Sequence, residues 1–144
     1  MADHNRYMSE AIKEAKKAFE KDEVPIGAIV VYEDKIIARA HNLTENLCDP
    51  TAHAEMQAIT AATSYMGGKY LNQCTLYVTL EPCPMCAGAL YWSQLGTLVY
   101  GAEDPKRGYR QLNPNMLHPR TKIIKNILPN DSADLMSTFF KKRR

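Results

Sequence analysis

Hydrophobic residues in the first third of the chain recur with two different periods. Over residues 4–21 they return every three or four positions with Lys and Glu between them, which predicts an amphipathic helix. The apolar run Ile26–Tyr32 is followed by the short turn Glu33–Asp34 and by Lys35–Asn42, which alternates as a half-exposed strand does. We therefore expect a helix followed by a β-hairpin.

The rest of the chain alternates between strand-like and helix-like segments. The continuous apolar run Thr75–Leu80 predicts a central strand that is buried on both faces. Such alternation is typical of an α/β layered sheet with parallel neighbours, in which ligands bind beyond the carboxyl ends of the strands. Two further helices are predicted over about 51–65, capped by Asp49 and ended by Gly67–Gly68, and from the Cys83–Cys86 segment to about Ser93. The remaining predicted elements are strands at 97–100 and 121–125, a basic loop between Asp104 and about Arg120, and a helix over about 131–142.

Length and composition predict one ordinary globular domain. The 144 residues can bury a sizeable core, and we interpret residues 1–144 as a single domain. Hydrophobic residues make up 45% and charged residues 24%, and no apolar run approaches the ~20 residues that span a bilayer. The N-terminal residues Met1–Asn5 are polar, unlike a signal peptide. We therefore expect a cytoplasmic protein without a membrane partner.

The net charge of +2 conceals an uneven distribution. Residues 1–64 contain seven basic and eleven acidic residues, a balance of −4, whereas residues 65–144 contain eleven basic and five acidic residues, a balance of +6. One-sided basic charge is expected of a protein that binds a phosphate backbone, but a solvated loop and a frayed terminus explain it equally well. No acidic residue lies between Pro105 and Asn130, whereas this stretch contains six basic residues: Lys106, Arg107, Arg110, Arg120, Lys122 and Lys125. The chain also ends with the basic run Lys141–Arg144.

Two short motifs contain an imidazole, a carboxylate and two thiols. His53 and Glu55 are two residues apart, and Cys83 and Cys86 are three residues apart. Two thiolates and an imidazole are good zinc ligands that leave the fourth tetrahedral position for water, and zinc lowers the pKa of that water. A carboxylate that is not a ligand can move protons beside the water. The order H-x-E followed by P-C-x-x-C is known for zinc-dependent nucleobase deaminases.

The spacing within the motifs also predicts where the metal lies. Cys83 and Cys86 fall on one face of a helix or tight turn, and the prolines on either side of Cys83 suit a strand end that leads into a helix. His53 and Glu55 can converge only near a helix end. We therefore expect a metal centre between two helix N-termini.

Other kinds of site share parts of this pattern. A C-x-x-C pair alone is often a redox pair or half of a structural zinc site. A closed structural site needs a fourth protein ligand, yet the sequence has no second C-x-x-C and no H-x3–5-H to supply one. The complete combination favours a catalytic zinc centre. Single residues that could still close the site are Cys48, Cys74, His41 and His118; otherwise Cys48 and Cys74 are free thiols.

The residues around both motifs resemble the cytidine-deaminase-like superfamily. Within it, the chain is most similar to the bacterial tRNA-specific adenosine deaminases, from about residue 5 to the C-terminus. The resemblance implies a three-layer α/β/α sandwich around a five-stranded mixed sheet, and a homodimer with its sites near the subunit interface. The matching segments are Glu23–Ala28, Asn42, Pro50–Glu55, Thr75–Cys83, Met85–Ala89 and Gly101–Asp104.

The resemblance also implies a reaction and a set of functional residues. The reaction is the hydrolytic deamination of adenosine to inosine at the wobble position of a tRNA anticodon, with one zinc ion per subunit. Glu55 is expected to take a proton from the attacking water, to protonate ring N1 and then to protonate the departing ammonia. The other implied roles are zinc binding by His53, Cys83 and Cys86, a hydrogen bond from Asn42 to the nucleoside, a pocket wall of Val24, Pro25 and Ile26, ribose contact by Asp104, and phosphate contact by Lys106 and Arg107.

One segment departs from the pattern of those enzymes. The loop after Asp104 is several residues shorter than usual, although this loop helps to define the RNA-binding surface. A zinc-dependent deaminase of a free nucleobase or nucleoside (guanine, cytosine or cytidine) would keep every zinc residue and lack the RNA role. A zinc-stabilised binding module without catalysis is a third interpretation, which requires a fourth protein ligand.

Overall fold

The computed structural model describes residues 3–143 of the chain. Met1, Ala2 and Arg144 lie outside the described residues, and so do the parts of the polar N-terminus and the basic C-terminal run that they form. The helices in the described part include none that is both long enough and apolar enough to cross a membrane. The elements are α1 (His4–Glu20), β1 (Gly27–Tyr32), β2 (Lys35–His41), α2 (Ala54–Met66), β3 (Thr75–Leu80), α3 (Pro84–Trp92), β4 (Thr97–Ala102), α4 (Tyr109–Leu112), β5 (Lys122–Ile124) and α5 (Pro129–Lys142).

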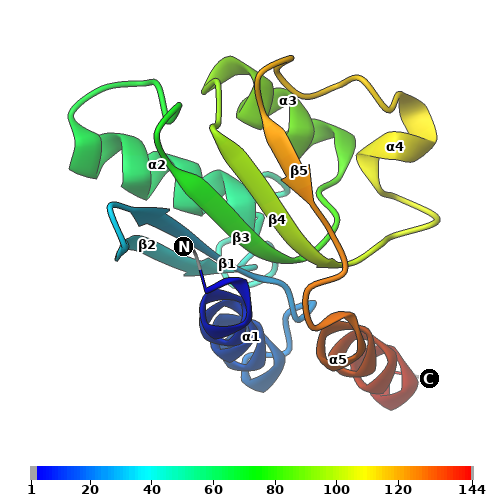
Figure 1. Ribbon diagram of the computed structural model, residues 1–144. Helices are drawn as coiled ribbons and strands as arrows, with labels where there is room; N and C mark the ends of the chain where they lie inside the picture. The colour runs from blue at the N-terminus through cyan, green and yellow to red at the C-terminus, as the bar shows by residue number, and fades with distance from the viewer. Residues whose placement is uncertain (1–2, 144) are drawn as a thin grey trace.

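Within residues 3–143 the strands form one five-stranded sheet in the order β2-β1-β3-β4-β5. Strand β1 is antiparallel to both of its neighbours, whereas β3, β4 and β5 run parallel to one another. Helices α1 and α5 cover one face of the sheet, and α2 and α3 cover the other (Figure 1). The predicted three-layer α/β/α sandwich with a mixed sheet is confirmed.

The sheet separates two hydrophobic layers, and β3 lies between them. Leu76 and Val78 of β3 belong to the layer shared with α2 and α3, whereas Tyr77 belongs to the layer shared with α1. Alternate residues of this strand are therefore buried on opposite faces, as its continuous apolar run predicts. Helix α1 packs so closely against the start of β1 that a Cβ at Gly27 would overlap backbone atoms of Ala11 and Ala15.

The turn chemistry explains the hairpin and the end of α2. Glu33 and Asp34 have positive φ values of 48° and 61°, as a two-residue hairpin turn requires. Gly67, with φ of 71°, ends α2 in the left-handed conformation that glycine adopts without steric cost. Both features agree with the sequence-based prediction.

Some predicted boundaries were wrong. Helix α2 begins at Ala54 and not near residue 51, because Asp49 caps a local turn instead of the helix: its Oδ1 accepts hydrogen bonds from the backbone N and the hydroxyl of Thr51 at 2.8 and 2.7 Å. Strand β4 continues to Ala102, and α5 starts at Pro129. The predicted basic loop also contains the short helix α4.

Candidate metal centre and active site

The N-terminal ends of α2 and α3 bring one imidazole and two thiols together. His53 is the N-cap residue of α2, Cys83 is the N-cap residue of α3, and Cys86 lies in the first turn of α3. His53 Nδ1 lies 3.6 Å from Cys83 Sγ and 3.5 Å from Cys86 Sγ. The three possible ligand atoms all lie within 4.8 Å of one another. This arrangement between two helix N-termini is the one that the motif spacing predicts.

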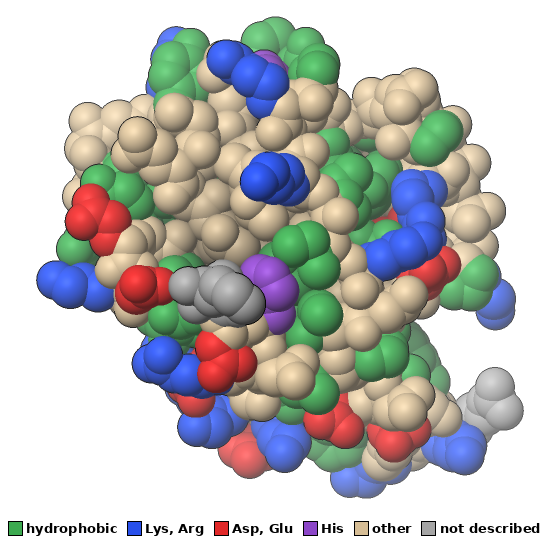
Figure 2. Space-filling model, viewed as in Figure 1, with side chains coloured by type: hydrophobic (Ala, Val, Ile, Leu, Met, Phe, Trp, Pro, Cys, Tyr) green, Lys and Arg blue, Asp and Glu red, His purple; other side chains and the backbone are tan. Residues whose placement is uncertain are grey.

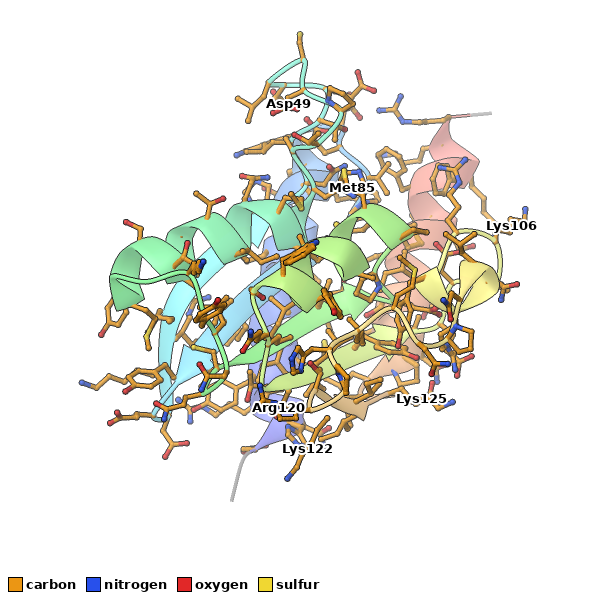
Figure 3. All side chains as sticks on the ribbon, turned by 90° about the horizontal axis from the view of Figure 1, so that it is seen from above. Asp49, Met85, Lys106, Arg120, Lys122 and Lys125 are labelled. Carbon is orange, nitrogen blue, oxygen red and sulfur yellow. The ribbon has the colours of Figure 1, made fainter. Side chains whose placement is uncertain are left out.

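The central strand determines where the two thiols lie. Strand β3 ends at Leu80, and only two residues separate it from Cys83. Pro84 then occupies the first turn of α3, where a missing N–H leaves no helical hydrogen bond unmade. Helices α2 and α3 pack against each other on one face of the sheet. Figure 3 shows Met85 at the start of α3, close to the point where α2 begins.

Hydrogen bonds within the cluster favour a thiolate on Cys83. Contacts from Cys86 and then from His53 outweigh the effect of burial and lower the pKa of Cys83 to about 4. The pKa of Cys86 is raised by its hydrogen bond to Cys83 and by burial, and the pKa of His53 is raised by its hydrogen bond to Cys83. Among the three groups, Cys83 is therefore the one whose thiolate the surroundings favour most.

Glu55 is a buried carboxylate beside this cluster. It is the second residue of α2, its side chain contacts the Cys86 thiol, and only 3% of it is exposed. Burial is the main cause that raises the pKa of Glu55 to about 7. Within residues 3–143 its Oε1 has no hydrogen-bond partner. A buried oxygen without a partner is costly, so this atom is available to a ligand.

The donor set fits a zinc ion with an open position. Two sulfurs and one imidazole nitrogen are ligand types that zinc prefers. Among the described residues the ligand group contains only these three side chains, so none of the four single-residue candidates for a fourth ligand belongs to it. Instead His41 contacts Glu14 and Lys21, His118 accepts from the backbone of Arg120, Cys48 is exposed, and Cys74 is buried immediately before β3.

Asn42 lies where the end of β2 meets the segment before β1. Its backbone N donates to the carbonyl of Ile26 at 3.1 Å, and the next residue, Leu43, donates to the carbonyl of Ala52 at 3.0 Å. The Asn42 side chain is buried, and within the described chain its Oδ1 has no hydrogen-bond partner. Pro25 is buried, whereas Val24 and Ile26 are half-buried. The structure thus brings Asn42 and the Val24–Ile26 segment together, next to the residues that lead into α2.

Asp104 organises the loop that follows β4. Its Oδ1 accepts hydrogen bonds from the backbone N of Lys106 at 3.1 Å and of Arg107 at 3.0 Å. Gly108 N closes the same turn by donating to the Asp104 carbonyl at 3.0 Å. The side chains of Lys106 and Arg107 are exposed, and Figure 3 shows Lys106 on this loop. The Asp104 side chain therefore has a local structural role, whatever it contacts in a substrate.

Comparison with known proteins identifies the family. The MafB19-like deaminase family matches residues 2–144. A tRNA-specific adenosine deaminase of Bacillus subtilis is 46% identical over all of this chain and 92% of its own length, and one of Aquifex aeolicus is 47% identical over 96% and 94%. The chain belongs to the tRNA-specific adenosine deaminase family.

Solved structures agree with this assignment. A structure from a study of A-to-I editing by tRNA:A34 deaminases has a TM-score of 0.83 to this deaminase, with 40% identity over 90% of this chain and 98% of that chain. The guanine deaminase of Bacillus subtilis has a TM-score of 0.67, with 38% identity over 71% of this chain and 66% of that chain. The family match confirms the resemblance that the two motifs indicate.

The basic stretch of this deaminase does not form one surface. Arg110 pairs with Glu103 at 2.7 Å and with Glu81 at 3.4 Å, and Lys125 pairs with Glu103 at 3.5 Å, so two acids that precede the stretch in sequence offset these charges. Figure 3 shows Arg120 and Lys122 far from Lys106. On the face in Figure 2, basic side chains around α1 and α5 are interspersed with acidic ones. Within this basic stretch, the two charges that lie on the Asp104 loop are therefore those of Lys106 and Arg107.

Two buried acids of the deaminase have roles that the sequence analysis did not predict. Glu23 accepts hydrogen bonds from the backbone N of Glu45 at 3.1 Å and of Asn46 at 2.7 Å, which holds the loop that leads to His53. Glu81 holds the segment after β4 in the same way. Their partners are more than 20 residues away, and the only signal in the sequence was the place of each acid in a matching motif.

Proposed function

We propose that this deaminase converts adenosine to inosine by hydrolysis at the wobble position of a tRNA anticodon. One observation carries the proposal: the His53, Cys83 and Cys86 group lies against the buried carboxylate of Glu55, whose Oε1 has no partner within residues 3–143. The relatives named as tRNA-specific adenosine deaminases support the choice of substrate.

His53, Cys83 and Cys86 would hold one zinc ion per subunit. Their donor types suit zinc, and the three-residue group leaves room for a fourth, non-protein ligand. Zinc, when bound, supplies an activated water molecule as the nucleophile. Zinc binds thiolates and neutral imidazole, so its affinity would fall as the pH is lowered.

Glu55 would move the protons of the reaction. Its carboxylate accepts one proton from the attacking water and delivers it to N1 of the adenine ring while the new C–O bond forms at C6. The same carboxylate then transfers the second proton of that water to the exocyclic nitrogen. The C6–N bond breaks, and ammonia is released. Inosine and ammonia account for all atoms of adenosine and water.

Other residues would bind the nucleoside and its neighbours. Asn42 would hydrogen-bond the nucleoside through Oδ1, which lacks a partner in the described chain. Val24, Pro25 and Ile26 would form the pocket wall, and Asp104 would face the ribose. Anticodon loops are single-stranded, so turning one base into such a pocket costs little.

The same proposal includes the domain organisation and the cellular compartment of the enzyme. We place residues 1–144 in one catalytic domain. We place the enzyme in the cytoplasm because two zinc-binding thiols suit a reducing compartment.

A homodimer through α3 would complete the assembly. One face of α3 carries a stripe of three residues spaced four and then three positions apart: Met85, Ala89 and Trp92. Trp92 is 78% exposed and Met85 37%, and an exposed apolar stripe of this kind marks a contact surface. Because Met85 lies between the ligands Cys83 and Cys86, such a dimer would place both sites near the interface.

Trp92→Glu is expected to shift the protein from dimer to monomer in sedimentation velocity, because a charge would be buried in the contact. Phe140→Glu is the matched control: Phe140 is also exposed, at 46%, but lies on α5, which covers the opposite face of the sheet. A wild-type monomer, or a Trp92→Glu dimer as stable as the wild type, would contradict the proposed interface.

The decisive assay of function uses an anticodon stem-loop RNA with a wobble adenosine. The zinc-loaded enzyme is expected to form inosine in that RNA, and to leave free adenine, guanine and cytidine unchanged. The likeness to guanine deaminase makes guanine the important competitor. Ammonia release from guanine without inosine in the RNA would replace the proposed function with deamination of a free base.

Lys106→Ala with Arg107→Ala is expected to weaken stem-loop binding and to leave the zinc content unchanged. Each lost phosphate contact on single-stranded RNA lowers the slope of log affinity against log salt by about 0.7. The double variant should therefore bind with a shallower salt dependence, measured by fluorescence anisotropy. The matched control is Arg120→Ala with Lys122→Ala, which removes the same charge from exposed positions at the far end of the sheet. Equal effects of both double variants would refute a specific role of the loop.

A further inference from the structure

A buried carboxylate stands two residues before the metal ligand Cys83. Glu81 is 4% exposed and does not belong to the ligand group. Its Oε1 accepts a hydrogen bond from the backbone N of Asp104 at 3.1 Å. Its Oε2 accepts from the backbone N of Arg110 at 3.2 Å and from Arg110 Nε at 3.4 Å. The two oxygens of one side chain thus hold both ends of the segment 104–110.

Backbone contacts continue the same attachment. Glu81 N donates to the Ala102 carbonyl at 2.8 Å, and Tyr109 N donates to the Pro82 carbonyl at 2.8 Å. The segment that contains Lys106 and Arg107 is therefore fastened, before and after those residues, to the two residues that lead into Cys83. Exposed loops are usually mobile, and this loop is tied to the central strand of the sheet.

The glycine at position 108 makes this close approach possible. Gly108 has φ of −63° and ψ of 149°, a conformation that any residue adopts. A Cβ there would overlap the carboxyl carbon and Oε2 of Glu81 and also the backbone carbonyl oxygen of Asp104. Glu81 and the Asp104 carbonyl therefore together occupy the space that any larger residue at position 108 would need.

We propose that Glu81 is a positioning residue for RNA binding, which fixes the loop of Lys106 and Arg107 relative to the metal centre. The proposal rests on the proposed function. Asp104 transmits the effect, because its backbone N is bound by Glu81 while its Oδ1 accepts from the backbone N of Lys106 and Arg107. A carboxylate is required because its three hydrogen-bond partners, Asp104 N, Arg110 N and Arg110 Nε, are all N–H donors. A glutamine side chain would turn its own NH2 group towards at least one of these donors.

Glu81→Gln tests this role without a change in side-chain size. We expect the KM for the stem-loop to rise about tenfold, the effect of one lost buried hydrogen bond, with kcat nearly unchanged. The zinc content should equal that of the wild type, and the amides of Asp104 and Arg110 should exchange faster with deuterium. Glu14→Gln is the matched control, since Glu14 is a buried acid on α1 that binds Lys17 and His41. It should leave the KM and both amides unchanged.

Gly108→Ala leaves Glu81 itself unaltered but forces the Glu81 carboxylate and the Asp104 carbonyl apart, so it tests the attachment of this loop even if Glu81→Gln folds poorly. Like Glu81→Gln, it should raise the KM and speed the exchange of the Asp104 and Arg110 amides. Gly68→Ala is the control, because a Cβ at Gly68 meets nothing within 4 Å, and it should change neither quantity. Unchanged exchange, or loss of zinc together with kcat, would overturn the positioning role. A wild type that fails to bind the stem-loop overturns the proposed function itself, whereas normal RNA binding by Glu81→Gln overturns this proposal alone.

Discussion

Replacing Glu55 with alanine is expected to lower the rate of inosine formation by about 100- to 10,000-fold, the usual contribution of a positioned general acid–base group. The physical reason is that the described residues offer no second carboxylate at the cluster that could exchange protons with the attacking water. Single-turnover assays on the stem-loop would measure the loss, and metal analysis would establish that zinc remains bound.

The same substitution should not destabilise the fold. Glu55 is buried, and its Oε1 makes no hydrogen bond within residues 3–143, so its removal relieves an unfavourable burial and loses only the contact with the Cys86 thiol. Thermal unfolding of the metal-loaded variant should therefore occur at or above the wild-type temperature. A variant that retains turnover within about tenfold of the wild type would exclude Glu55 as the general acid–base.

Cys86→Ala is expected to abolish both zinc binding and deamination. The Cys86 side chain is fully buried and contacts the His53 imidazole, so no solvent ligand can replace it without a change in the start of α3. Because metal binding is coupled to folding, the variant should also unfold at a lower temperature than the zinc-loaded wild type. Metal content by mass spectrometry and thermal unfolding followed by circular dichroism would measure these effects.

Cys74→Ala is the matched control for that experiment. Cys74 is another buried thiol, but it lies immediately before β3 and outside the ligand group. It should keep one zinc per chain and normal turnover, with only the stability loss of a small buried side chain. Full zinc content in Cys86→Ala, or loss of zinc in Cys74→Ala, would contradict the assignment of the ligands.

The elements of the fold were predictable wherever a hydrophobic period extended over several residues. The helix over residues 4–21, the hairpin and the central strand were identified because burial on a helix face or a sheet face imposes a regular pattern. Helix α4 was missed because Tyr109–Leu112 is too short to show a period. The start of α2 was misplaced because Asp49 can cap either a helix or a turn, and the hydrogen bonds that decide between them involve its own neighbour Thr51.

The positions of the candidate site residues were also predictable in part. His53, Cys83 and Cys86 come together as expected, because helix N-termini that follow a central strand can hold ligands from two distant motifs. Pairings across the fold could not be predicted in this way. Glu103 precedes the basic stretch yet pairs with both Arg110 and Lys125, so a run of basic residues in the sequence did not become one basic surface.

X-ray absorption at the zinc edge of the wild-type protein tests the central claim most directly. The account predicts one zinc per chain with two sulfur ligands at about 2.3 Å and two lighter ligands near 2.0–2.1 Å, one of them an imidazole and the other from water. A protein that binds no zinc, or a zinc ion with three or four sulfur ligands or a second imidazole, would contradict it.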